Sequence, residues 1–301
     1  MQNLPTIKLS ELTSIYSTVS LINKFIHYPI KERITITIDF KGEFVNPICL
    51  GLVASALQLL KSNYKEVLIN LVNTDSIIFG YAKRMDFINY CESNYFINTT
   101  KFTLSNNLIE ITSFNETNDN NVAERIVNLI KNRSRGVNQD IIELLHFCMG
   151  EIISNVTTHS KSKTGGLAVA QFYPKNNEFK ILVCDNGIGI HESLTSNDKY
   201  AALSESQALF ESFKKGVTSG DGMGMGLFYT SRFMESNKGI LELYSSNHRY
   251  YQRGSYKGVY PHSNWQGVAL YLKVNTEIEV NPEFVTEGYT GYKATFDFFF
   301  D

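Results

Sequence analysis

Alternation of β-branched and polar residues predicts strands in the first third of the chain, and apolar runs between them favour helices. The Asn46-Pro47 pair is a typical start signal for the first of these helices. The predicted elements are strands 34–40 and 66–72 and helices 48–62 and 77–91. This strand–helix–strand–helix order predicts a small α/β domain over residues 1–112.

The second half of the chain has a different pattern. Residues 113–137 begin with a polar, turn-prone stretch (SFNETNDNN) and are predicted to form a linker with a helix. Residues 138–301 open with a long helix pattern, followed by strand-like runs. The predicted elements from residue 113 onward are helices 121–133 and 138–160 and strands 167–173, 179–184, 239–244 and 267–274. Helices combined with antiparallel strands indicate an α+β fold for the second domain.

The composition limits the classes of protein and of partner that fit this chain. The chain is 43% hydrophobic and 19% charged, so it can bury a core. Its formal net charge of -2 gives no basic excess that would favour nucleic acid or an anionic membrane as the main partner. The apolar run 48–60 is too short to span a bilayer, and the N-terminus has no signal-peptide pattern. Four scattered cysteines are typical of reduced core thiols, so a cytoplasmic soluble protein is expected.

Three short segments of the second domain indicate chemistry. The first lies in helix 138–160, where Glu151, Asn155 and His159 are spaced i, i+4 and i+8 and therefore line one face. The amide oxygen of Asn155 is a hard ligand suited to Mg²⁺, and the Glu151 carboxylate is suited to accept a proton from an attacking water. Alone, the spacing also fits a solvated polar stripe on an amphipathic helix.

The second segment is Asp185-Asn-Gly187-Ile-Gly189, directly after an apolar strand that ends at Cys184. A half-buried Asp at a strand end can accept a hydrogen bond from an exocyclic amine such as that of adenine. The two glycines let the backbone approach a flat ligand closely. An ordinary Asn-Gly turn after a strand would have the same sequence, so this segment alone is also weak evidence.

The third segment has glycines at alternate positions before a helix-like stretch. Their free backbone N–H groups and the N-terminal dipole of that helix favour phosphate. No Gly-Lys-Ser/Thr follows, so this is not a Walker loop, and the polar stretch before it does not fit a Rossmann fingerprint. A flexible hinge remains the alternative. The residues of the segment are Gly220, Gly222, Gly224, Gly226 and Leu227.

Taken together and in this order, the three segments resemble the N box, the first glycine box (DxGxG) and the second glycine box (GxGxGL) of one superfamily. Its members are the gyrase, heat-shock chaperone, histidine-kinase and mismatch-repair ATPases, called GHKL or Bergerat-fold proteins. The resemblance covers residues 138–275. It implies a Bergerat-type α/β sandwich with a mixed sheet and helices on one face, and it implies that the domain binds ATP and Mg²⁺.

The resemblance also implies a role for each matching residue. Asn155 would ligate the Mg²⁺ that bridges the phosphates, and Glu151 would position or deprotonate water. Asp185 would hold the adenine amine. Gly187 and Gly189 would let the adenine pocket close, and the second glycine box would wrap the triphosphate.

Other expectations concern the surroundings of these boxes. Residues 191–220 would form a mobile lid, from which Lys215 is a candidate phosphate ligand, with a solvated helix face as the alternative. His159 is interpreted as pocket wall rather than nucleophile. Family members usually carry Gly-Thr on a late strand, whereas this chain has Gly267-Val268, which lacks the hydroxyl. The sequence therefore departs from the family in one polar contact.

Basic residues alternate with tyrosines in residues 246–266, between the last two predicted strands. This pattern resembles a nucleic-acid or phosphate-binding surface. A packed surface insertion is favoured instead, because the chain as a whole is not basic.

The first domain suggests a partner. Its element order and the stretch around Ser76 loosely resemble a STAS domain, the fold of anti-sigma antagonists, in which a Ser near the end of the second strand can be phosphorylated. A helix N-cap is the alternative for Ser76. Such a domain joined to an ATPase suggests a regulatory protein partner bound through residues 1–112. The tail, residues 292–301, has a strand pattern that could pair within the sheet or with a second copy, so a homodimer is possible.

Two functions remain open. The first is a slow ATPase that acts as a nucleotide-driven regulatory switch, with Glu151 as base. The second is a serine protein kinase or a nucleotide-gated binding module of the anti-sigma type. His146 lies on the same predicted helix as Glu151, too close to belong to a separate phosphoacceptor domain, which argues against histidine autophosphorylation. Glu151 favours hydrolysis, because nucleotide binding alone does not need a base.

Overall fold

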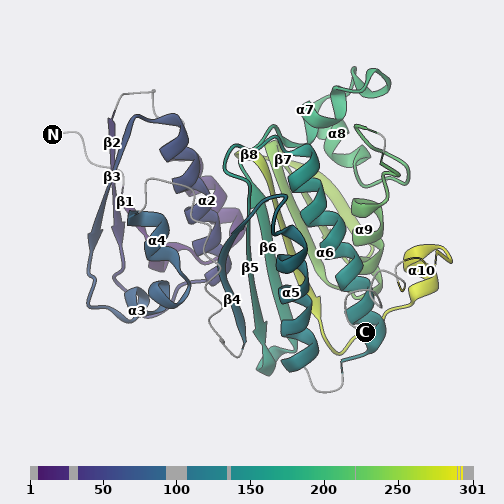
Figure 1. Ribbon diagram of the computed structural model, residues 1–301, viewed down its shortest axis with the longest axis horizontal. Helices are drawn as coiled ribbons and strands as arrows, with labels where there is room; N and C mark the ends of the chain where they lie inside the picture. Colours follow the sequence, from purple (N-terminus) through teal and green to yellow (C-terminus); the bar gives the residue numbers. More distant parts are fainter. Residues whose placement is uncertain are drawn as a thin grey trace.

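Strands and helices form four layers (Figure 1). The computed structural model describes residues 6–26, 33–92, 107–133, 137–220, 222–289, 291 and 293. A three-stranded sheet, a layer of helices, a five-stranded sheet and a second layer of helices follow one another across the molecule. The expected α+β class, with a small α/β region preceding the second domain, is confirmed. The tail strand predicted for residues 292–301 falls, except for Lys293, outside the described residues.

The first sheet is parallel, in the order β1-β2-β3. Asn46 sets the start of the central helix, because its side-chain oxygen accepts a hydrogen bond from the Ile48 amide ahead of Pro47. The predicted helix 77–91 is two helices instead, because Asp86 adopts a left-handed backbone (φ 61°) between them. The elements are β1 (Thr6–Lys8), η1 (Leu9–Glu11), α1 (Ile15–Ile26), β2 (Arg33–Asp39), α2 (Pro47–Asn63), β3 (Glu66–Val72), α3 (Ile77–Arg84) and α4 (Phe87–Glu92).

The second sheet is antiparallel at every pairing, in the order β4-β5-β6-β8-β7, where the resemblance implied a mixed sheet. Its first strand, β4, covers residues expected at the end of the first domain and the start of the linker. The elements are β4 (Leu108–Phe114), α5 (Asp119–Arg133), α6 (Gln139–His159), β5 (Gly166–Tyr173), η2 (Pro174–Asn176), β6 (Glu178–Asp185), α7 (Gly189–Thr195), η3 (Asp198–Tyr200), α8 (Glu205–Glu211), α9 (Gly226–Ser236), β7 (Ile240–Arg253), β8 (Tyr256–Asn275) and α10 (Pro282–Thr286).

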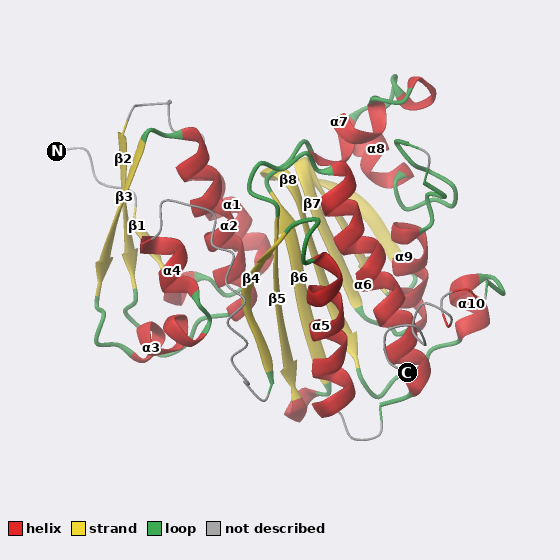
Figure 2. Cartoon of the chain, in the orientation of Figure 1, coloured by secondary structure: helices red, strands yellow, loops and turns green. Residues whose placement is uncertain are grey.

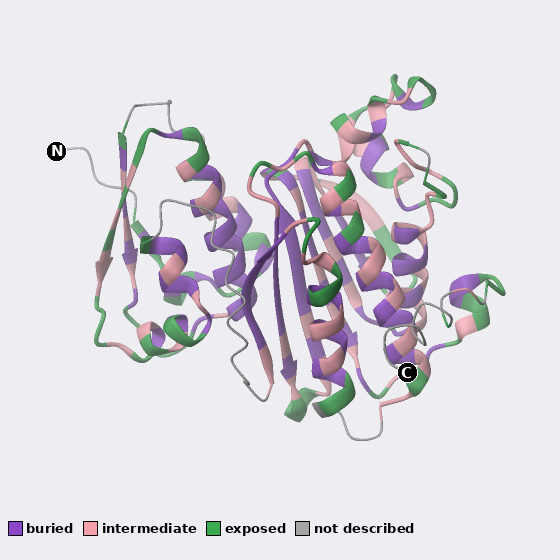
Figure 3. Cartoon of the chain, viewed as in Figure 1, coloured by how far each residue is buried: buried purple, intermediate pink, exposed green. Residues whose placement is uncertain are grey.

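Both faces of the five-stranded sheet are covered. Figure 2 shows α5, α6 and α9 against one face, while α1 and α2 lie on the other. Nearly all of α2 is buried (Figure 3), because it packs against both sheets. At Gly51 of α2 a Cβ atom would lie 2.7 Å from Val169 and 2.9 Å from Leu182, which are residues of the second sheet. The helix therefore lies in close contact with that sheet.

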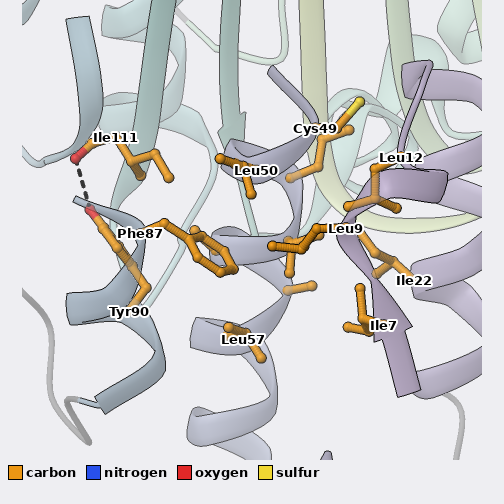
Figure 4. Close-up of a cluster of buried hydrophobic side chains, with 14 of the residues drawn as sticks. Ile7, Leu9, Leu12, Ile22, Cys49, Leu50, Leu57, Phe87, Tyr90 and Ile111 are labelled. Atoms are coloured by element: carbon orange, nitrogen blue, oxygen red, sulfur yellow. Dashed lines mark hydrogen bonds between the residues drawn. The ribbon is translucent and has the colours of Figure 1, made fainter. Parts of the chain in front are cut away.

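One apolar cluster joins the first region, which comprises the elements from β1 to α4, to the second sheet. Figure 4 shows its side chains from β1, η1, α1, α2, α4 and β4 gathered around α2. At its edge the Tyr90 hydroxyl donates a hydrogen bond to the Ile111 carbonyl of β4, at 3.5 Å. Burial of this continuous apolar surface stabilises the first region and the sheet together.

Residues 246–266 form the far half of the long β7–β8 hairpin. Arg249 lies over the rings of Tyr16 and Tyr251, each 5.0 Å from its centroid, and pairs with Glu242 at 3.7 Å. The Arg/Tyr alternation seen in the sequence is thus the two-residue period of a strand pair that contacts α1. Among the described residues, no helix is long and apolar enough to cross a membrane.

Candidate functional site

A cavity of about 1000 Å³ lies between α6, α9 and the sheet end next to α7. All three segments singled out in the sequence contribute to its wall. The predicted site residues that line it are Glu151, Asn155, Asp185, Gly189, Gly222, Gly224, Gly226 and Leu227. Gly187, Gly220 and Lys215 are not among the lining residues. Residues far apart in sequence thus meet at one hollow, as the motifs predicted.

Helix α6 directs one face at the cavity and another into the core. The Asn138 side chain accepts a hydrogen bond from the Asp140 amide at 2.7 Å and caps the start of the helix. From there the helical period brings Glu151, Asn155 and His159 to the cavity wall. Glu151 is half-buried, and burial raises the pKa of its carboxyl. Its carboxylate is therefore a stronger proton acceptor than an exposed one.

Asp185, the last residue of β6, is a buried carboxylate with only 2% of its surface exposed. One carboxylate oxygen accepts a hydrogen bond from the Gly187 amide at 2.7 Å. In the described part of the chain, no basic side chain forms an ion pair with it. Burial raises the pKa of Asp185 to about 7, although hydrogen bonds from the Gly187 and Val268 amides lower it. A buried carboxylate held by backbone donors alone can accept a further hydrogen bond from a ligand.

Gly187 lets the Asp185 turn close against the end of α6. A Cβ atom here would lie 1.9 Å from the Ser160 carbonyl oxygen, which no side chain could tolerate. The same carbonyl accepts a hydrogen bond from the Ile188 amide at 2.8 Å. Gly187 therefore acts by shaping the turn, although it does not line the cavity itself.

The start of helix α9 also lines the cavity. Its N-cap residue, Met225, makes no side-chain capping hydrogen bond and offers no acceptor to the amides of the first turn. A Cβ atom on Gly226 would lie 2.7 Å from Oε2 of Glu151 and 2.9 Å from its Cβ. The helix N-terminus thus lies directly against the Glu151 side chain. This part of the cavity wall combines an anion-attracting dipole with a proton acceptor.

The segment predicted as a lid is folded into short helices, α7, η3 and α8. Leu194, Tyr200 and Ala208 form a small apolar cluster of their own inside it. Its last part carries Lys215, which pairs with Glu287 rather than with the cavity. For Lys215 to reach a bound ligand, it would have to leave this partner, and the predicted phosphate contact stays a prediction.

Aromatic residues that the sequence analysis missed complete the wall. Tyr289, beyond α10, lines the cavity and stacks on Tyr229 with ring centroids 6.2 Å apart and planes 6° apart. Phe147 of α6 lies against both rings. No motif surrounds Tyr289 in the sequence, so only the path of the chain after β8 could bring it here.

Comparison with known proteins agrees with this geometry. The family model described as "Histidine kinase-, DNA gyrase B-, and HSP90-like ATPase" matches residues 140–257, from α6 into β8. All three motif segments lie inside this range. No match was found among curated proteins. The match does not include the first region, and the STAS resemblance of that region is not confirmed. Residues 140–257 of this chain therefore match an ATPase domain of the GHKL type, and this match supports ATP binding.

Proposed function

We propose that the chain binds Mg-ATP in the cavity between α6, α9 and the sheet, hydrolyses it slowly, and uses the nucleotide state to regulate a protein partner. The observation that carries this proposal is the Asp185 carboxylate, which lines the cavity, is buried, and has no cationic partner in the described residues. The adenine amine would donate a hydrogen bond to it. A buried carboxylate that has backbone donors but no cationic partner is costly, which is typical of a ligand-binding role.

The part of the cavity wall at the start of α9 suits the phosphates. The uncapped first turn of α9 and the glycine backbone around Gly224 offer N–H donors to an anion. The described residues contain no group of three or more His, Cys, Asp or Glu side chains that could hold a metal ion. Mg²⁺ fits such a site, because it is usually bound through one or two protein oxygens together with substrate phosphates and waters. Asn155 would supply the protein oxygen, and the bound ion would neutralise charge on the phosphates.

Glu151 would accept the proton of the attacking water. Its carboxyl lies against the start of α9, where the terminal phosphate would bind, and burial raises its pKa above the ordinary value. The Glu151 carboxylate would also orient the water by accepting its hydrogen bond. The aromatic side chains of Phe147, Tyr229 and Tyr289 line the same region and would exclude bulk water.

Calorimetric titration with a non-hydrolysable ATP analogue, with and without Mg²⁺, tests the binding site. We expect Mg²⁺ to strengthen binding to the wild-type protein. Absence of binding under both conditions would contradict the proposed function.

Asn155→Ala is expected to remove the effect of Mg²⁺ on ATP affinity, a loss of at least about tenfold, because the ion loses its protein ligand. The measurement is the same titration at zero and millimolar Mg²⁺. Thr157→Ala is the matched control, since Thr157 lies two positions along α6 and does not line the cavity. A variant at Asn155 that keeps the full Mg²⁺ dependence would rule out this residue as the ligand.

Gly226→Ala is expected to weaken ATP binding about tenfold or more, because the added methyl group would push Glu151 into the phosphate region. Gly150→Ala, on α6 next to Glu151, is the control, since a Cβ atom there would meet nothing within 4 Å. The control should keep its affinity and gain about 0.5–1 kcal/mol of stability from the better helix former. Equal affinities for the two variants would show that the α9 start does not contact the ligand.

A serine protein kinase of the anti-sigma type would use the same cavity, since Glu151 could equally accept a proton from a Ser hydroxyl. Incubation with γ-labelled ATP separates the two functions. Label released as free phosphate supports the ATPase, and stable label on protein supports the kinase.

The partner would bind through the first region, which exposes Phe44 and Ile77, with 66% and 72% of their surface accessible. Ser76 caps α3 by accepting a hydrogen bond from the Phe79 amide, so a phosphate on Ser76 would change this end of the region. The four cysteines are free and buried, which suits a reducing compartment such as the cytoplasm.

A further inference from the structure

Asn186, between the proposed adenine-binding Asp185 and Gly187, directs its side chain at α2 of the first region. Its amide nitrogen donates to the Ser55 carbonyl at 2.9 Å, and the Ser55 hydroxyl donates to its amide oxygen at 3.2 Å. Ser55 is 1% exposed and Asn186 is 8% exposed. This reciprocal pair of hydrogen bonds joins residues 131 positions apart. It is a direct polar link between the first region and the ATPase domain.

Packing alone does not account for the pair. A hydroxyl in the middle of a buried helix costs free energy unless it is hydrogen-bonded. The neighbouring position, Gly51, already allows α2 to approach the sheet closely. Ser55 is therefore best explained by what it binds, which is the side chain of Asn186.

The rest of the turn is held by β8. The Trp265 indole donates to the Asp185 carbonyl at 3.3 Å, and the Gln266 amide donates to the Asn186 carbonyl at 3.2 Å. With the Ser55 contacts, the turn is fixed from two sides by groups outside the cavity. The direction of the Asp185 carboxylate depends on this turn, because the residue itself has no side-chain partner among those described.

We infer that Ser55 and Asn186 are positioning residues for base recognition, through which α2 orients the Asp185 carboxylate toward the adenine amine. This inference rests on the proposed function of Asp185. Because α2 also packs against the first sheet, any partner that shifts α2 changes ATP affinity, and ATP binding changes the affinity of that partner by the same factor.

The test measures ATP and GTP affinity by calorimetry for the full chain and for Ser55→Ala, Asn186→Ala and the double variant. Guanine carries a carbonyl where adenine carries its amine, so the ratio of ATP to GTP affinity reports how well Asp185 is oriented. We expect Asn186→Ala to weaken ATP binding about tenfold, the loss for a buried hydrogen bond, and to leave GTP binding unchanged. Ser55→Ala should also weaken ATP binding and leave GTP binding unchanged. The double variant should lose less ATP-binding free energy than the two single variants lose together.

Leu57→Ala is the control for a general loss of stability. Leu57 lies two positions along α2, in the apolar cluster with the first region, and is fully buried. Its truncation should lower the melting temperature and keep the ATP-to-GTP ratio. If both test variants keep the wild-type ratio, or if Leu57→Ala lowers the ratio equally, the inference is overturned. If the wild-type protein itself fails to bind ATP, the proposed function fails first, and the two failures are thereby distinguished.

Discussion

Asp185→Asn is expected to lower ATP affinity roughly 100-fold and to stabilise the fold at pH 8. The Gly187 amide already donates to one side-chain oxygen, and an Asn that keeps this bond would turn its own NH₂ group toward the adenine amine. Two donors would then face each other, and the charge-assisted hydrogen bond would be lost, at a cost of about 2–3 kcal/mol.

The stability that Asp185→Asn is expected to gain depends on pH. The pKa of Asp185 is raised from 3.8 to about 7 by burial, so the folded state holds this proton more tightly than the unfolded state does. The tighter binding of this proton in the folded state raises the free energy of unfolding. The contribution is fully present below pH 3.8 and is lost as the pH rises through about 7. Above that pH the ionised carboxylate destabilises the wild-type fold, by an amount on the order of 4 kcal/mol.

Thermal unfolding of the wild-type protein and of Asp185→Asn between pH 4 and pH 8 checks this sign. The variant should melt higher at pH 8, and the difference should shrink as the pH falls. A variant that binds ATP normally would remove Asp185 from the adenine site. One that is less stable than the wild type at pH 8 would mean that the carboxylate stabilises the fold.

Glu151→Gln is expected to keep ATP affinity and to reduce turnover by about 10²–10⁴-fold, the usual contribution of a general base. Gln keeps the size of the side chain and its contact with Gly226, but it cannot accept a proton at neutral pH. Calorimetry gives the affinity, and release of phosphate under saturating ATP gives the rate.

Asp140→Asn is the matched control, because it removes a carboxylate from the same helix at a position that does not line the cavity. Its turnover should equal that of the wild type. Unchanged turnover in Glu151→Gln would mean that another group activates the water. A joint loss of affinity and rate would indicate that Glu151 contributes to binding instead.

Local patterns in the sequence were sufficient to predict several elements and the polar and glycine-rich part of the cavity wall. Helix α2, strands β2, β3, β5 and β6, and the long helix α6 follow from hydrophobic periodicity and start signals, because these depend on neighbouring residues along the chain. The order and context of the three polar and glycine-rich segments predicted that Glu151, Asn155 and Asp185 would meet. Each segment carries its own recognisable chemistry, and the matched family model agrees with their shared context.

Other features depend on contacts between distant residues, which no local pattern encodes. The sequence of β4 fits either domain, and its pairing with β5 assigned it to the second sheet. Lys215 had been a candidate phosphate ligand, and the fold gives it Glu287 as a partner from beyond α10. For β4 and Lys215 the difference is a long-range contact that forms only when the chain has folded.

For the two regions, too, the sequence determined the local conformations, whereas the tertiary structure determined the contact between them. From the sequence, α2 was a helix of a separate small domain, and Asn186 was one residue of an Asn-Gly turn. The sequence determined both local conformations, since an apolar helix and a turn after a strand are stable local choices. Only the tertiary structure decided that α2 packs on the five-stranded sheet and that Ser55 binds Asn186. Burial of α2 between two sheets leaves a buried hydroxyl and a buried amide that must satisfy each other.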